Sequence, residues 1–237
     1  MSAEVWYRHY ISLGYFCSVA MELERIGLRS ASYPFDWLIT PDLSNVMKYI
    51  RNGFDGFLEV SEMIQDAEVS STYINRTTGF KYVHDFKASI PAAEQIDDVA
   101  LKYRRRIDRF YRDITEPTLF VRYISDEKVC EDGRYADLSW IEDNITDIEQ
   151  TLRSYNPDNR IIWIGNSALE STAIPIYTVD KDEGDSVARK PLEKNVGLND
   201  LLMNAYYPER EKNLEVYRAK MRKKNSPIAR IRRKLFG

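Results

Sequence analysis

The chain has 237 residues, of which 43% are apolar and 12% aromatic, and this is enough to build one globular domain with a substantial core. We find no run of about 18 or more apolar residues and no basic segment followed by an apolar one at the amino terminus, which excludes a transmembrane helix and argues against a secretory signal. Two cysteines do not make a disulfide framework, so we expect a reduced, cytoplasmic setting.

The charge is unevenly distributed along the chain. The net charge is −3, but residues 218–237 carry nine Lys or Arg and no acid, which leaves 25 basic against 37 acidic residues elsewhere. An acidic body does not favour nucleic acid as a partner. We therefore predict one domain over residues 1–217 and a basic tail over 218–237. Apolar residues at roughly helical spacing in the tail suit a peripheral contact with the anionic inner face of a membrane, and the alternative is a frayed, solvated end. These apolar residues are Ile228, Ile231, Leu235 and Phe236.

The first half of the chain begins with a predicted strand over residues 7–14, which ends at a glycine. A helix is expected next, because apolar residues recur on one face between residues 17 and 28. A second helix is expected over 41–54, and Tyr-, Ile- and Val-rich runs around a Thr-Gly turn predict a hairpin over 71–86. The face of the first helix is formed by Val19, Ala20, Leu23 and Ile26.

The second half alternates helices with apolar strands. Continuous apolar stripes predict helices over 96–114 and 137–155, and apolar runs predict buried strands over 117–124 and 159–166. This order is typical of a parallel sheet covered on both faces. The expected fold is therefore α/β: a single domain with a mostly parallel sheet flanked by helices and an inserted hairpin. Further along the chain we expect a strand over 173–180, a polar and mobile loop over 179–195 and a short helix over 197–207.

Cys17 is the first candidate for chemistry, because it follows a strand and a glycine and begins a helix. Amide groups and the helix dipole stabilise a thiolate at such a position, and glycine permits the tight turn. A free cysteine is also commonly buried as a small apolar residue, so a structural role is the alternative. Cys17 lies at the border of the apolar stripe, and we predict that it faces a cleft rather than the core.

A cysteine nucleophile usually needs a histidine base, and the chain has two histidines. His9 lies in the strand that leads to Cys17 and is too far upstream to touch it. His84, with Asp85 beside it, is the sensible partner, although a single histidine on a strand is more often structural. The cysteines and histidines lack metal-ligand spacing and the glycines do not form a phosphate loop, so we expect no metal and no cofactor.

Three polar residues lie at the ends or in the middle of apolar segments. Asp36 stands in P-F-D-W, Arg122 interrupts an apolar strand and Asn166 closes another. Because ligands bind outside the carboxyl ends of strands in open α/β sheets, Arg122 and Asn166 are candidates for the same crevice as Cys17. We predict that Arg122 faces a ligand there, since its guanidinium suits carboxylate or phosphate. In the alternative, Asp36 caps a turn, Arg122 pairs with an acid and Asn166 begins a loop.

The segment S-L-G-Y-F-C followed by P-F-D-W, together with V-H-D-F and F-V-R-Y, resembles a bacterial family described as putative papain-like cysteine peptidases of unknown function. The resemblance is strong over Ser12–Thr40 and thin beyond Asn166. It implies a thiol hydrolase with Cys17 as nucleophile, His84 as base and a setting near surface-polysaccharide synthesis. The third, orienting residue would be Asn166 or Asp36, and the substrate-binding residues would be Ser12, Gly14, Trp37, Asp85 and Arg122.

Two features leave alternatives open. A papain-like α+β fold would place the cysteine helix against an antiparallel sheet that carries the histidine, whereas the second half of the chain suits a parallel sheet better. A Rossmann-like fold would instead favour a glycan-pathway transferase or a sugar-phosphate binding protein, with Arg122 on the anionic group. A third hypothesis is a non-catalytic partner of membrane-associated machinery, docked by the basic tail. For the hydrolase we expect a small-molecule, glycan or peptide substrate.

Overall fold

The computed structural model describes residues 6–185 and 187–225. Within them, sheet A consists of four strands, all parallel, that lie side by side in chain order. Each was predicted from the sequence, and β6, at the centre of the sheet, is buried along its whole length. The strands are β1 (His9–Ser12), β6 (Thr118–Tyr123), β7 (Arg160–Asn166) and β8 (Ile176–Val179).

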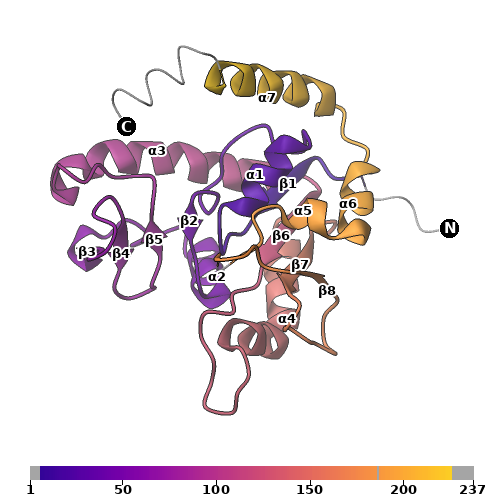
Figure 1. Cartoon of the computed structure of the whole chain (residues 1–237), viewed down its shortest axis with the longest axis horizontal. Helices are drawn as coiled ribbons and strands as arrows, with labels where there is room; N and C mark the ends of the chain where they lie inside the picture. The colour runs from indigo at the N-terminus through magenta and orange to yellow at the C-terminus, as the bar shows by residue number, and fades with distance from the viewer. Residues whose placement is uncertain (1–5, 186, 226–237) are drawn as a thin grey trace.

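Helices cover both faces of sheet A (Figure 1). Successive residues of β6 point to opposite faces, so Val121 and Tyr123 enter one apolar core while Phe120 enters the other. The first core packs against α1 (Ser18–Arg25), α5 (Pro191–Lys194) and α6 (Val196–Met203), and the second against α2 (Leu43–Arg51), α3 (Ala92–Asp113) and α4 (Ala136–Tyr155). The predicted α/β architecture, with a parallel sheet between helices, is confirmed.

A small antiparallel sheet, sheet B, is inserted between α1 and α3 in the chain. The predicted hairpin is present as β4 (Tyr73–Asn75) and β5 (Lys81–Tyr82), which pair antiparallel. Two strands that were not predicted extend it: β2 (Leu38–Ile39) pairs with β5, and β3 (Met63–Gln65) follows the 3-10 turn η1 (Val60–Glu62) and pairs with β4.

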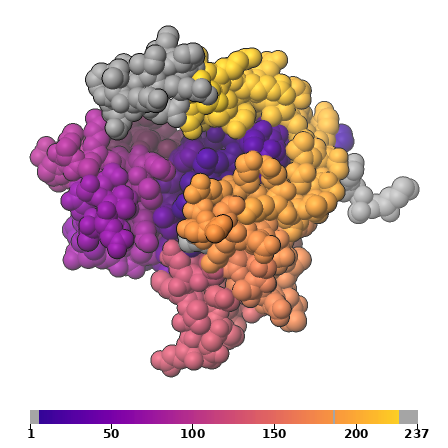
Figure 2. Space-filling view, viewed as in Figure 1, coloured from indigo at the N-terminus to yellow at the C-terminus, as the bar shows by residue number. Residues whose placement is uncertain are grey.

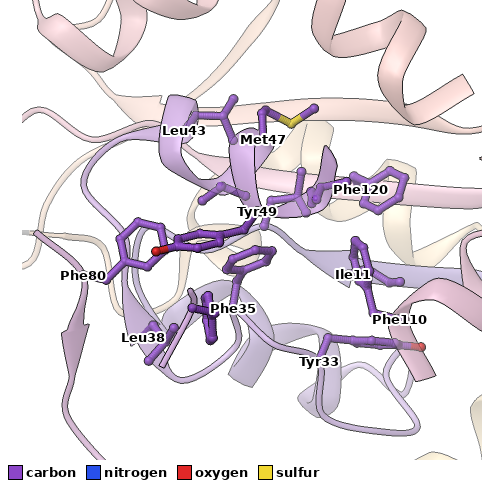
Figure 3. Packing of buried hydrophobic residues seen from close by; sticks show 14 of the residues in the cluster. Ile11, Tyr33, Phe35, Leu38, Leu43, Met47, Tyr49, Phe80, Phe110 and Phe120 are labelled. Atoms are coloured by element: carbon purple, nitrogen blue, oxygen red, sulfur yellow. The ribbon is translucent and has the colours of Figure 1, made fainter. Parts of the chain in front are cut away.

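The P-F-D-W segment contributes Phe35 to an apolar core. The Phe35 ring is fully buried and packs against Phe54 and Phe80, with ring centroids 5.3 and 6.5 Å away. Figure 3 shows Phe35 among Tyr49, Phe80 and neighbouring apolar side chains. Burial of large aromatic side chains is a main source of folding free energy, so part of this motif is explained by packing alone.

The C-terminal part contains a helix that was not predicted, α7 (Arg210–Lys224). The boundary placed between residues 217 and 218 falls inside this helix, while the apolar tail residues Ile228, Ile231, Leu235 and Phe236 lie outside the described residues. In the loop over 179–195, Val187 and Ala188 are buried. No helix of the described residues is long and apolar enough to cross a membrane.

Helix α7 lies against α1, although none of its residues is buried. The amide of Asn213 donates to the Gly27 carbonyl at 3.1 Å, and Lys220 pairs with Glu24 at 2.8 Å. Gly27 is needed here, because a Cβ at this position would stand 2.8 Å from the Arg210 carbonyl oxygen. Figure 2 shows the indigo part of the described chain between yellow α7 and the orange C-terminal segment.

Candidate functional site

A tight turn carries the chain from β1 into α1 at the carboxyl edge of sheet A. Gly14 has φ +80° and Tyr15 has φ +32°, so both lie in the region that favours glycine. The Ser12 hydroxyl accepts a hydrogen bond from the Gly14 amide at 3.1 Å. A Cβ at Gly14 would stand 2.4 Å from Thr40 Oγ1, so the turn fits only a glycine without rearrangement.

Cys17 occupies the N-cap position of α1 and is half-buried. Its carbonyl accepts from the Met21 amide at 3.0 Å, which begins the helix. No side chain caps this end and no acidic residue stands in the first turn. In the described part of the chain, the amide groups of residues 18–20 have no hydrogen-bond acceptor. The predicted position of Cys17 at the beginning of a helix is therefore present.

Burial raises the pKa of the Cys17 thiol above its ordinary value of 9.0, and the residue's own backbone amide opposes this only in part. The expectation that the helix N-terminus would favour the thiolate is therefore not met in this state, because removal of water outweighs the nearby amides. At neutral pH the resting side chain is a protonated thiol. A nucleophilic role requires a base that removes this proton.

Ser18, the next residue, supplies a polar group that the sequence did not single out. Its side chain is 2% exposed, and its hydroxyl has no hydrogen-bond partner within the described residues. Leaving a buried hydroxyl unpaired costs free energy, so such groups are uncommon in folded proteins. The first turn of α1 thus carries unpaired amides, an unpaired hydroxyl and a thiol. The only signal in the sequence was the Cys-Ser pair after the glycine turn.

His84 lies in a bend just after β5 and is exposed. Its ring makes an edge contact with Trp37, with centroids 6.2 Å apart. Over the described residues, no hydrogen bond joins His84 to Cys17. The strand pairing explains this. Leu38 pairs with Tyr82, and Thr40 donates to the Tyr15 carbonyl at 2.9 Å.

Because β2 and β5 are antiparallel, the chain beyond Tyr82 runs past Trp37, away from Thr40 and therefore away from the cysteine turn. Three extended residues separate Trp37 from Thr40, which corresponds to roughly 10 Å. The two sides of the predicted pair are therefore held on one scaffold through β2 but are not assembled in this state.

The residues predicted to orient the base are engaged elsewhere. Asp36 is fully buried, where it accepts from Arg29 Nε at 2.9 Å and from the Tyr33 amide at 2.8 Å. Burial raises the pKa of its carboxyl group, although Arg29 opposes the change. Asn166 donates to Asp126 and accepts from the Ala168 amide at 2.7 Å. Neither side chain is bonded to His84, so Asp36 anchors its loop and Asn166 holds the turn after β7.

Asp85 does not orient His84 either. Its carboxylate accepts from the Tyr103 hydroxyl at 2.8 Å and pairs with Lys102. These bonds tie the end of sheet B to α3. Trp37 is half-buried, and its indole N–H donates to the Ser32 hydroxyl at 3.3 Å. Ser12 and Gly14 are buried within the turn that they form.

Arg122 does not face a ligand crevice, which corrects the sequence prediction. It is fully buried and pairs with Asp137 at 2.8 Å. The same guanidinium donates to the Leu13 carbonyl, the Thr40 hydroxyl and the Thr40 carbonyl at 2.8–3.1 Å. A buried charge is tolerated when it is paired and hydrogen-bonded, so Arg122 joins β1, β2 and α4 from inside the core.

The carboxyl edge of sheet A also carries a polar cluster that sequence reasoning missed. The carboxylate of Asp126, just after β6, accepts a hydrogen bond from the Asn166 side-chain amide and forms an ion pair with Lys181. Tyr15 lies in the same region, where burial and the nearby Glu127 raise the pKa of its hydroxyl well above its ordinary value. These residues follow strand ends far apart in the sequence, and only the pairing of the strands brings them together. Among the described residues, no group of three His, Cys, Asp or Glu could hold a metal ion.

Comparison with known proteins found a relative of this chain and a family model that matches it. The chain is 28% identical over 224 residues to an uncharacterized protein of Acanthamoeba polyphaga mimivirus, an alignment that covers 82% of this chain and 97% of the viral protein. No solved structure matches. A family model described as "Putative papain-like cysteine peptidase (DUF1796)" matches residues 8–157, which include both sheet B and the cysteine turn. The chain belongs to this family.

Proposed function

We propose that the protein is a thiol-dependent hydrolase of acyl bonds in which Cys17 is the nucleophile. The observation that carries this proposal is the first turn of α1, where a half-buried thiol stands beside amide groups that have no acceptor in the described residues. Such amides suit the negative oxygen that develops when a nucleophile attacks a carbonyl. Membership of the cysteine peptidase family supports the same chemistry.

In the proposed reaction, the Cys17 sulfur forms a bond to the carbonyl carbon of a peptide, amide or ester. The free amides of the first turn stabilise the oxyanion, and the bond to the leaving group then breaks. A base takes the thiol proton and returns it to the leaving group. Water then attacks the thioester carbonyl, which releases the acid and restores the thiol. Because burial raises the pKa of the Cys17 thiol, the proposed reaction assigns removal of its proton to a base.

His84 is the proposed base, and its exposure and its place just after β5 of sheet B support this role. The pair is not assembled at rest, so we propose that substrate binding brings the end of β5 toward the cysteine turn. Geometry in unliganded enzymes is often loose, and a pair that is open at rest remains a candidate. Neither Asp36 nor Asn166 is placed to complete a triad, so the proposal needs only the two residues.

The transferase alternative loses its main contact, because Arg122 is enclosed by protein groups. The parallel sheet would still suit that alternative. A connection to surface-polysaccharide synthesis, and a bacterial source, stay predictions from the resemblance. A membrane contact through residues 218–237 stays a prediction from the charge and apolar residues of that segment.

The test uses p-nitrophenyl acetate, which acylates reactive thiols, and detects the adduct by intact mass and peptide mapping. We expect acetylation of Cys17 in the wild-type chain and none in Cys17→Ala. The matched control is Cys130→Ala, because Cys130 is the other free, half-buried cysteine and lies in the loop before α4. This control should acylate as the wild type does. Equal labelling at both cysteines, or none at Cys17, would contradict the proposal.

His84→Ala separates the base from the nucleophile. If His84 takes the proton, acylation should slow by about 10²-fold or more, while the fold is retained because the side chain is exposed. His9→Ala serves as the control, since His9 bonds Glu116 at 3.1 Å, far from the turn. Unchanged acylation in His84→Ala would leave Cys17 as a nucleophile and remove His84.

A further inference from the structure

A cavity lies away from the cysteine turn, near the start of the described chain. It has a volume of about 550 Å³, within the range of small-molecule sites. Its wall combines residues just before and within β1, the start of β6, one side chain of β8, helix α6 and the residues just after α6. Figure 1 shows α6 beside the amino-terminal end of the described chain. Neither Cys17 nor His84 lines it, and the proposed hydrolase reaction makes no use of it.

Aromatic rings dominate this wall. Trp6 and Tyr206 lie with ring centroids 4.7 Å apart and planes inclined by 42°. Tyr7 and Tyr10 meet edge to face at 6.1 Å. Tyr177 adds a further ring from β8. Rings in different orientations around one space present several negative faces to an occupant, which is the arrangement that attracts an organic cation.

The charge of the cavity wall also favours a cation. Asp200 is the one charged residue that lines the cavity as described, and it has no ion pair among the described residues. Its side chain projects from α6, whose first turn also contributes Gly197 to the wall and therefore leaves space there. A carboxylate beside aromatic faces complements a positive charge, whereas a phosphate or carboxylate ligand would be repelled.

Two arginines near the cavity do not line it. Arg210 donates to the carbonyls of Leu202, Met203 and Ala205 behind α6. Arg160 donates to the carbonyls of Pro157 and Asn159. Both guanidinium groups keep their positive charge, but neither forms an ion pair with Asp200 among the described residues.

We propose that this cavity binds a small organic cation that carries a quaternary ammonium group, held by the aromatic rings and by Asp200. The rings accept the methylated, weakly hydrated head, and the carboxylate balances its charge. The site is independent of Cys17, so its success or failure does not decide the hydrolase proposal.

The test is titration calorimetry on the full-length chain with choline as the probe. Its neutral isostere, 3,3-dimethylbutan-1-ol, has the same shape with carbon in place of nitrogen. We expect choline to bind about tenfold more tightly than the alcohol, the size of effect that cation–π contacts and one carboxylate produce. Equal binding of both compounds, or binding of neither, would overturn the proposal.

Variants then locate the site. Asp200→Asn should weaken choline binding about tenfold, while Asp98→Asn, an exposed acid on α3, should leave it unchanged. Tyr206→Ala removes an exposed ring and should also weaken binding, whereas Tyr206→Phe keeps the ring and should not. If phosphatidylcholine vesicles bind the chain and free choline does not, the site recognises a membrane surface and the small-molecule assignment is wrong.

Discussion

Two polar regions meet at the carboxyl edge of sheet A, and they differ in how completely their groups are paired. On the face covered by α2 and α4, Arg122 makes four hydrogen bonds, with only its Nε left without a partner among the described residues, and the Asp137 carboxylate also accepts from the Leu43 and Ser125 amides. On the other face, the first turn of α1 presents unpaired amides and the unpaired Ser18 hydroxyl. The paired region is scaffolding, and the unpaired region is where a ligand can gain hydrogen bonds that the protein leaves open.

Replacing Arg122 tests the scaffolding side and has the largest expected effect. Arg122→Met should lower the free energy of unfolding by about 3–5 kcal/mol, because it leaves the buried Asp137 carboxylate without its partner. Urea denaturation measures the change. The control is Arg153→Met, whose ion pair with Glu149 is on the surface and is expected to contribute less than about 1 kcal/mol. Similar losses in both variants would mean that the buried network does not hold the edge together.

Gly14 lies between the two regions. Replacing it, alongside a control glycine, separates the free-energy cost of an unfavourable φ from the cost of steric crowding by the new Cβ. Gly14→Ala should cost about 2–4 kcal/mol, because the positive φ is unfavourable and the new Cβ meets Thr40 Oγ1, which itself accepts from Arg122. Gly53→Ala is the matched control, since Gly53 has φ +72° but nothing within 4 Å of a new Cβ. The difference between the two variants in thermal or urea unfolding gives the crowding part. No difference would show that Thr40 moves aside freely.

Two serines test whether the first turn of α1 is truly unsatisfied. Ser18→Ala should stabilise the fold by about 1 kcal/mol, because it removes an unpaired buried hydroxyl and places a good helix former in α1. Ser12→Ala should destabilise it by about 1 kcal/mol, since the Ser12 hydroxyl accepts from Gly14. Both values come from the same denaturation assay. Destabilisation by Ser18→Ala would reveal a partner for its hydroxyl and weaken the contrast between the regions.

The pH dependence of Cys17 alkylation tests the smallest expected effect, the influence of the unpaired region on the Cys17 pKa. Only the thiolate reacts with iodoacetamide, and burial raises the Cys17 pKa, so the rate in the folded chain should still be rising above pH 9.0. The same chain unfolded in urea should approach its maximal rate at lower pH. The measurement is made in the Cys130→Ala variant, so that all alkylation comes from Cys17. A folded-state midpoint below that of the unfolded chain would show that the helix amides outweigh burial.

Periodic patterns were sufficient to predict the main elements of the fold. Helices α3 and α4 carry long apolar stripes, and β6 and β7 are nearly continuous apolar runs, so these elements and their inward faces could be predicted from the sequence. The strands β2 and β3 have two and three residues, too few for alternation to be recognised. Helix α7 has no buried residue and therefore no apolar stripe, and polar contacts to α1 position it instead.

The candidate site was predicted in part. A strand, a glycine turn and a helix beginning at Cys17 are local features, and the sequence places them correctly. The role of Arg122 was wrong, because the sequence shows a charge inside an apolar strand but not that Thr40 and Asp137 arrive beside it. The separation of His84 from the turn depends on the direction in which β5 pairs with β2, and that register is a property of the folded chain.

The strand order of sheet A has a consequence for how the chain folds. His9 pairs with Thr118, whereas Trp163 pairs with Ile176, so β1 closes a far longer loop than β8 does. Closing a longer loop has a larger entropic cost, so we expect β6, β7 and β8 to associate first and β1 to dock late. The Arg122 network needs the end of β1, and it would form only after the folding transition state. Its loss should then appear mainly as faster unfolding, with the refolding rate little changed.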